Sequence, residues 1–121
     1  MTRIAVVEDN PDNRLLVQAL LEDRYELTEY DNGKDALDGI QQEKPDAVLL
    51  DISLPEMDGL EVLQHIRANE HLKDLHVIAL TAHAMAGDRE NFLQAGFNDY
   101  ITKPILDETV LIDAIEAGLN T

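Results

Sequence analysis

Short apolar runs alternate with longer segments of helical spacing along this chain of 121 residues. Such alternation is typical of βαβ units, in which helices join the strands of a parallel sheet. Five apolar or alternating runs predict strands, at residues 3–7, 25–30, 47–50, 76–80 and 99–101. The segments that follow them have the period of helices with one apolar face. The pattern therefore predicts an α/β fold, a doubly wound five-stranded parallel sheet with helices on both faces.

Polar caps, prolines and glycines limit the predicted helices. The first has Asn10 as its N-cap and Pro11 as its first residue. The second starts at about residue 34 and ends before Pro45, the third starts near Gly59, the fourth ends at Gly96, and the fifth continues to the end of the chain. The predicted inner faces consist of Leu15, Leu16, Ala19 and Leu20 in the first helix and Phe92, Leu93 and Ala95 in the fourth.

Length and charge restrict the class of protein. The chain suits one domain, which we expect to cover residues 1–121. Its 25 acidic and nine basic side chains give a formal net charge of −16, which would repel nucleic acid and anionic lipid surfaces. The absence of cysteine excludes disulfides and thiolate catalysis, and the apolar stretch near the N-terminus is too short for a signal peptide. We therefore expect a cytoplasmic protein that binds neither nucleic acid nor membranes directly.

Four predicted strands are followed by polar or charged side chains. Glu8 and Asp9 follow the first strand, Asp51 the third, Thr81 the fourth and Lys103 the fifth. Doubly wound sheets bind ligands beyond the carboxyl ends of their strands, so these side chains are candidates for one site. Three neighbouring carboxylates repel each other unless a cation compensates them. Mg²⁺ suits such a site because it binds one or two carboxylates and keeps waters that a phosphate can replace.

In combination, these residues resemble the receiver domain of bacterial response regulators, the phospho-acceptor module of two-component signalling in the CheY-like superfamily. Four motifs carry the resemblance: the acidic pair Glu8-Asp9, "DISLPEMDG" from Asp51, "LTAHA" around Thr81, and "YITKPI" around Lys103. The resemblance covers essentially the whole chain and implies a flavodoxin-like (βα)5 fold with strand order 2-1-3-4-5. It also implies a receiver without an output domain, and the initiating Met1 favours a free-standing one.

The resemblance assigns the central role to Asp51, as the carboxylate nucleophile that takes a phosphoryl group from a phosphohistidine on a partner protein. Asp9 would bind Mg²⁺ directly, Asp51 would share it, Glu8 would hold it through water, and the backbone carbonyl of Ser53 would complete the protein ligands. We also expect Asp51 to keep one oxygen open to solvent. Such a protein is a signalling switch rather than an enzyme, since phosphorylation and dephosphorylation act on the protein itself.

The resemblance also implies a switch. Lys103 would neutralise phosphoryl oxygens, Thr81 would offer a hydroxyl donor, and Ala82 would be small enough to admit the phosphoryl group. Thr81 would then move toward the phosphoryl group and Tyr100 would turn inward, which changes the surface of the fourth helix, fifth strand and fifth helix. His83 and Ser53 would modulate the phosphoryl lifetime, and the family usually has the Lys103-Pro104 peptide bond in cis. The implied partners are a sensor histidine kinase or a histidine phosphotransfer protein, docking near the first helix, and a downstream protein target.

Three alternatives were weighed against this interpretation. A phosphatase of the haloacid dehalogenase kind needs a second aspartate two positions after its nucleophile, where this chain has Ser53. A calcium-binding EF-hand loop that starts at Asp51 needs glycine at its sixth position, where this chain has Glu56. A phosphorylation-independent receiver-like binding module remained open. The histidines at 65, 71 and 76 form no pair with zinc-binding spacing, so we expect them on the surface.

Overall fold

The computed structural model describes residues 2–82, 88–103 and 107–119. Its strands are β1 (Arg3–Val7), β2 (Glu26–Tyr30), β3 (Ala47–Asp51), β4 (His76–Thr81) and β5 (Asp99–Thr102). Its helices are α1 (Pro11–Leu21), α2 (Gly33–Gln42), α3 (Gly59–Ala68), α4 (Asp88–Ala95) and α5 (Glu108–Leu119). The predicted strands and helices are thus confirmed, with small differences at their ends. No helix in the described ranges is long and apolar enough to cross a membrane.

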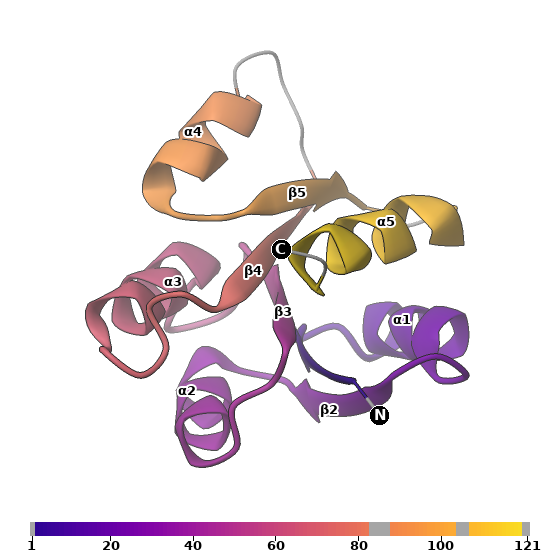
Figure 1. The fold of residues 1–121 in the computed structure, drawn as a ribbon, viewed down its shortest axis with the longest axis horizontal. Coiled ribbons are helices and arrows are strands. Elements are labelled where there is room, and N and C mark those ends of the chain that lie inside the picture. The colour runs from indigo at the N-terminus through magenta and orange to yellow at the C-terminus, as the bar shows by residue number, and fades with distance from the viewer. Residues whose placement is uncertain (1, 83–87, 104–106, 120–121) are drawn as a thin grey trace.

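All the strand pairs are parallel, and the sheet has the order β2-β1-β3-β4-β5. Figure 1 shows α1 and α5 on one face of the sheet and α2, α3 and α4 on the other. The predicted α/β fold class, the strand order and the coverage of both faces are confirmed. Because β1 lies between β2 and β3, the chain passes from β1 to β2 in one direction across the sheet and from β2 to β3 in the opposite direction. That reversal of direction opens a crevice at the carboxyl ends of β1 and β3.

Two hydrophobic clusters cover the two faces of the sheet, because alternate side chains of each strand point to opposite sides. One cluster joins Val7, Leu50 and Ala79 to the inner faces of α2 and α3. The other joins Val6 and Leu49 to α1 and α5. Both sides of β3 are buried along its whole length, which explains its uninterrupted apolar sequence. A rigid, doubly covered strand therefore ends at Asp51.

The inner faces of α1 and α4 differ from prediction. In α1 the fully buried residues are Val17 and Leu21, whereas Leu15 is 63% exposed. In α4 Leu93 is 41% exposed, and the half-buried Phe92 makes the contact with the core. The apolar stripe of each helix is wider than the part of the helix that packs on the core. The spacing of the apolar residues therefore does not determine which side chains of the stripe are buried.

Candidate functional site at the strand ends

The sheet brings the predicted carboxylates and Lys103 to one edge. Glu8 directly follows β1, and its backbone N–H donates to the Tyr30 carbonyl at 3.0 Å, which extends the pairing with β2 by one residue. Asp51 is the last residue of β3. Lys103 follows β5, and its backbone N–H donates to the Thr81 carbonyl at 2.7 Å. Backbone bonds between neighbouring strands therefore fix the positions from which these side chains extend.

Lys103 bridges two buried carboxylates. Its Nζ lies 3.0 Å from Glu8 Oε1 and 3.2 Å from Asp51 Oδ1. Glu8 is fully buried and Asp51 is only 2% exposed, so the expectation of a solvent-facing oxygen on Asp51 is wrong. The reason is that the Lys103 ammonium contacts the carboxylate at close range. Buried charges need such partners because the interior solvates them poorly.

The site also has the features of a divalent cation site. One carboxylate oxygen each from Glu8, Asp9 and Asp51 lies within 4.8 Å of the other two. Asp9 is exposed, so the group opens to solvent on that side. Within the described part of the chain, Glu8 Oε2 is buried without a hydrogen-bond partner. Hard oxygen donors with an unsatisfied buried carboxylate oxygen fit Mg²⁺ or a bound water.

The pKa values of the buried pair are displaced in opposite directions. Burial raises the pKa of Glu8 to about 7, and the neighbouring Asp51 adds to that rise. Burial would also raise the pKa of Asp51, but the neighbouring Glu8 side chain, the hydrogen bond from the Ser53 backbone N–H and the charge of Lys103 together outweigh it and lower this pKa. Burial disfavours the charge on Lys103, yet the two carboxylates outweigh it and raise its pKa. At neutral pH Asp51 is therefore ionised, whereas Glu8 is only partly ionised.

The loop after Asp51 returns closely against it. The Ser53 N–H donates to Asp51 Oδ1 at 3.1 Å, which orients the carboxylate. The Gly59 N–H donates to the Ile52 carbonyl at 2.9 Å, and a Cβ at Gly59 would lie 2.4 Å from the Asp51 carbonyl oxygen. Only glycine allows this approach. Asp58 then caps α3 by accepting from the Glu61 N–H at 2.9 Å.

Comparison with known proteins agrees with this geometry. Residues 4–116 match the family described as the response regulator receiver domain. This chain belongs to that receiver family. Receiver domains are signalling modules of two-component systems, so the resemblance inferred from the four motifs is confirmed.

The relatives of this receiver domain include much longer sensor proteins and a response regulator of similar length. It is 47% identical over 107 residues to the sensor protein GacS of Pseudomonas syringae pv. syringae, a match that covers 85% of this chain and 12% of GacS. It is 44% identical over 103 residues to the polar-differentiation response regulator DivK of Brucella anthropi, covering 84% of each. The solved receiver domain of the sensor histidine kinase PA1611 from Pseudomonas aeruginosa, which has a magnesium ion in its active site cleft, aligns with a TM-score of 0.89 at 38% identity, over 99% of this chain and 98% of that one.

Thr81 and Ala82, which were also predicted for the site, lie at the same edge of the sheet. Thr81 ends β4 and is nearly buried, and Ala82 next to it is exposed. Tyr100 is half-buried in β5, and its ring centre lies 5.5 Å from that of Phe92 on α4. His83 and the Lys103-Pro104 peptide bond lie outside the described residues. His65 and His71 are exposed as predicted.

Three side chains, those of His76, Arg14 and Arg67, make contacts that were not predicted from the sequence. His76 is half-buried rather than exposed, because its Nε2 lies 3.0 Å from the Ala114 carbonyl of α5. Arg14 donates from Nη1 to the carbonyls of Glu8 and Asp9, at 2.7 and 3.2 Å. Arg67 donates to carbonyls in two loops far from the acidic site. The available signal for Arg14 was its place one turn into the helix that follows the acidic pair.

Proposed function

We propose that this receiver domain accepts a phosphoryl group on Asp51 from a phosphohistidine and signals through a changed surface. One observation carries the proposal: Asp51 Oδ1 is held by the Lys103 ammonium and the Ser53 N–H, while the oxygens of Glu8 and Asp9 lie within 4.8 Å. An ionised carboxylate needs no general base to act as a nucleophile, so positioning and charge neutralisation are what the protein must supply.

The transfer step follows from this arrangement. An Asp51 carboxylate oxygen attacks phosphorus, the P–O bond forms, and the P–N bond to the donor imidazole breaks with its electron pair returning to nitrogen. The Lys103 ammonium, already bound to Asp51, shifts to a phosphoryl oxygen as negative charge moves there. The Thr81 hydroxyl, at the end of the adjacent β4, offers a further donor. Asp9, Asp51, Glu8 and the Ser53 carbonyl would hold Mg²⁺, which when bound neutralises phosphoryl oxygens.

The proposed response is a population shift between two states of the surface formed by α4, β5 and α5. Tyr100 supports this role because it lies in β5 and its half-buried ring contacts Phe92 of α4. Movement of Thr81 toward the phosphoryl group would let Tyr100 turn inward, with Ala82, Ser53 and His83 adjusting access to the site. A downstream protein would then recognise the surface in one of its two states.

The proposed phosphodonors are a sensor histidine kinase or a histidine phosphotransfer protein. Their docking near α1 is supported by Leu15, which is 63% exposed on the helix that starts beside the acidic pair. An exposed leucine beside a polar site is a suitable apolar contact for a protein partner.

The test is intact-protein mass spectrometry after incubation with acetyl phosphate or phosphoramidate, with and without Mg²⁺. We expect the wild type to gain one phosphoryl group only with Mg²⁺ and Asp51→Asn to gain none. Asp46→Asn, at an exposed aspartate before β3, is the matched control and should behave as the wild type. A wild type that gains nothing would instead favour a phosphorylation-independent binding module.

A further inference from the structure

The acidic pair lies where the sheet stops supporting the main chain. The last paired residues of β1 and β2 are Val7 and Tyr30, and the Glu8 N–H makes one more bond to Tyr30. Beyond Tyr30 the chain turns away toward α2. The carbonyls of Glu8 and Asp9 therefore extend past the end of the neighbouring strand. A main chain without strand bonds is free to reorient unless another group holds it.

Arg14 supplies hydrogen bonds to these two carbonyls, which extend past the end of β2. Its Nη1 donates to the Glu8 carbonyl at 2.7 Å and to the Asp9 carbonyl at 3.2 Å. One guanidinium nitrogen thus holds two consecutive peptide units, those that follow the two carboxylate-bearing residues. Hydrogen bonds from a charged donor are stronger than neutral ones, so this is an effective clamp.

The first turn of α1, which carries Arg14, is itself fixed by hydrogen bonds. The Asn10 side chain accepts from the N–H groups of Asp12 and Asn13, at 2.8 and 3.2 Å, and so caps α1. The Arg14 N–H donates to the Asn10 carbonyl at 3.1 Å as the first turn closes. Arg14 is therefore attached to the helix that begins directly after the acidic pair, and its side chain folds back over that pair.

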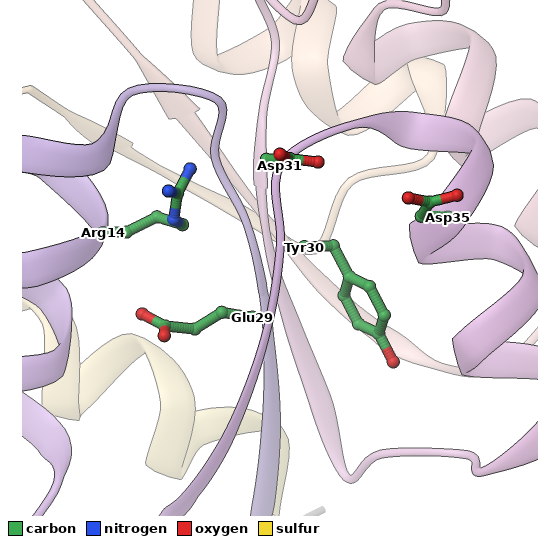
Figure 2. Close-up of a pocket in the computed structure, with 5 residues that line it drawn as sticks. All are labelled: Arg14, Glu29, Tyr30, Asp31 and Asp35. Carbon is green, nitrogen blue, oxygen red and sulfur yellow. The ribbon is translucent and has the colours of Figure 1, made fainter.

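An open pocket with several acidic lining residues lies beside Arg14. It has a volume of about 270 Å³ and is lined by Arg14, Glu29, Tyr30, Asp31 and Asp35. Figure 2 shows Arg14 extending from α1 on one side of β2, with Glu29 below it and Asp35 on α2 beyond the strand.

We propose that Arg14 is a positioning residue for the divalent cation: it fixes the main chain of Glu8 and Asp9 so that their carboxylates face Asp51 together. The inference rests on the proposed function, since it takes these carboxylates as Mg²⁺ ligands. Arg14 acts through the main chain and touches neither the metal nor the phosphoryl group.

A purely electrostatic role and a positioning role of Arg14 predict opposite changes in Mg²⁺ affinity when Arg14 is replaced by methionine. Removing a positive charge near carboxylates strengthens cation binding if only charge matters. Removing the clamp weakens cation binding, because the ligands must then be ordered by the metal itself. The direction of the change in Mg²⁺ affinity therefore separates the two explanations.

The experiment is an Mg²⁺ titration followed by amide NMR spectra, on the wild type, Arg14→Met and Lys34→Met. Lys34 is exposed on the first turn of α2, so Lys34→Met removes the same charge at the same end of the sheet without touching the acidic pair. We expect the Kd for Mg²⁺ to rise roughly 10-fold or more in Arg14→Met, as for other residues that orient metal ligands. We expect Lys34→Met to bind as tightly as the wild type or more tightly.

The spectra also report folding, and thermal unfolding without Mg²⁺ measures stability separately. An unchanged or lower Kd in a folded Arg14→Met, even one of reduced stability, overturns the inference and leaves the proposed function standing. If Arg14→Met does not fold, Arg14→Lys replaces it, and a Kd several-fold above that of the wild type supports positioning whereas a wild-type Kd overturns it. A wild type that shows no Mg²⁺ binding overturns both the inference and the metal site of the proposed function.

Discussion

At the scale of single residues, Glu56 has a backbone conformation that glutamate rarely adopts. Its φ is 63°, in the left-handed region, where it forms a tight turn closed by the Met57 N–H and the Pro55 carbonyl at 2.7 Å. This i to i+2 bond around a positive φ makes a γ-turn, which costs a residue with a Cβ about 1–2 kcal/mol and which glycine adopts without that cost. Glu56 lies in the loop that leads from Asp51, at the end of β3, to α3.

Glu56→Gly is therefore expected to raise the free energy of unfolding by about 0.5–1 kcal/mol, measured by urea denaturation, because the relief of strain exceeds the entropy that glycine adds to the unfolded chain. The matched control is Glu56→Gln, which removes the same charge and keeps a long side chain, so it should leave the left-handed strain in place. Equal stability of the two variants would mean that charge, not backbone conformation, is what matters at this position.

Tyr25 gives the stability a dependence on alkaline pH. Its buried hydroxyl donates to Glu116 on α5, and burial together with that carboxylate raises the pKa of Tyr25 from 10.0 to about 12. The folded state thus holds the phenol proton more tightly than the unfolded chain. The contribution of this proton to stability is complete below pH 10 and is lost as the pH rises toward 12.

We expect urea denaturation of Tyr25→Phe to show a weaker fall in stability over this pH range than the wild type. At neutral pH the variant should lose about 1 kcal/mol, because Glu116 loses a donor. Parallel curves for the two proteins at high pH would show that another group causes the alkaline loss.

At the scale of elements, one arginine joins the ends of α3, α4 and β5. Arg67, in the last turn of α3, donates from Nε and Nη2 to the Gly96 carbonyl, at 2.9 and 2.6 Å. Its Nη1 donates to the carbonyls of Lys73 and Leu75, at 2.9 and 2.7 Å. Nη2 also donates to Asn98 at 2.9 Å, which completes the donors of the guanidinium. The C-terminal end of α4 is thereby tied to α3, while most of its outer face is exposed.

Replacement of Arg67 by lysine should cost about 2–3 kcal/mol of unfolding free energy, since an ammonium cannot match the planar set of donors. Amide exchange at Gly96 and Phe97 should accelerate more than exchange in β1. Arg24→Lys, at an exposed arginine after α1, is the control and should stay within about 0.5 kcal/mol of the wild type. A loss as small as that control's would contradict the role given to Arg67.

At the scale of the whole molecule, a net charge of −16 acts against the compact state. The thermal midpoint should therefore rise as NaCl increases from roughly 0.01 M to about 1 M, because salt screens repulsion between exposed carboxylates. Choline chloride should produce a similar rise, since its large cation cannot enter the site of Glu8, Asp9 and Asp51. A midpoint that responds to neither salt would show that the surface charges are already balanced locally.

The sequence predicted strands better than helix faces, for a physical reason. The central strands are buried on both sides, so their apolar runs end almost where the strands end, as at Asp51. Side chains directly after such strands were placed correctly, which brought Glu8 and Lys103 together. The rotation of α1 was wrong at Leu15, because the sheet and α5 choose which part of a broad apolar stripe is covered. The contacts of Arg67 were missed because most of its acceptors are backbone carbonyls, which carry no signature in the sequence, and the place of Arg14 in the first helix did not identify its carbonyl acceptors.

The bond between Lys103 and Glu8 joins residues that are 95 positions apart. During synthesis the N-terminal part of a chain leaves the ribosome first, so the acidic residues of β1 and β3 are made well before the lysine that lies between them. A nascent or truncated chain that stops before β5 lacks the ammonium group that pairs with the buried carboxylates of Glu8 and Asp51. The charge arrangement at this edge of the sheet therefore forms only after residue 103 has been synthesised, although both acidic strands exist long before.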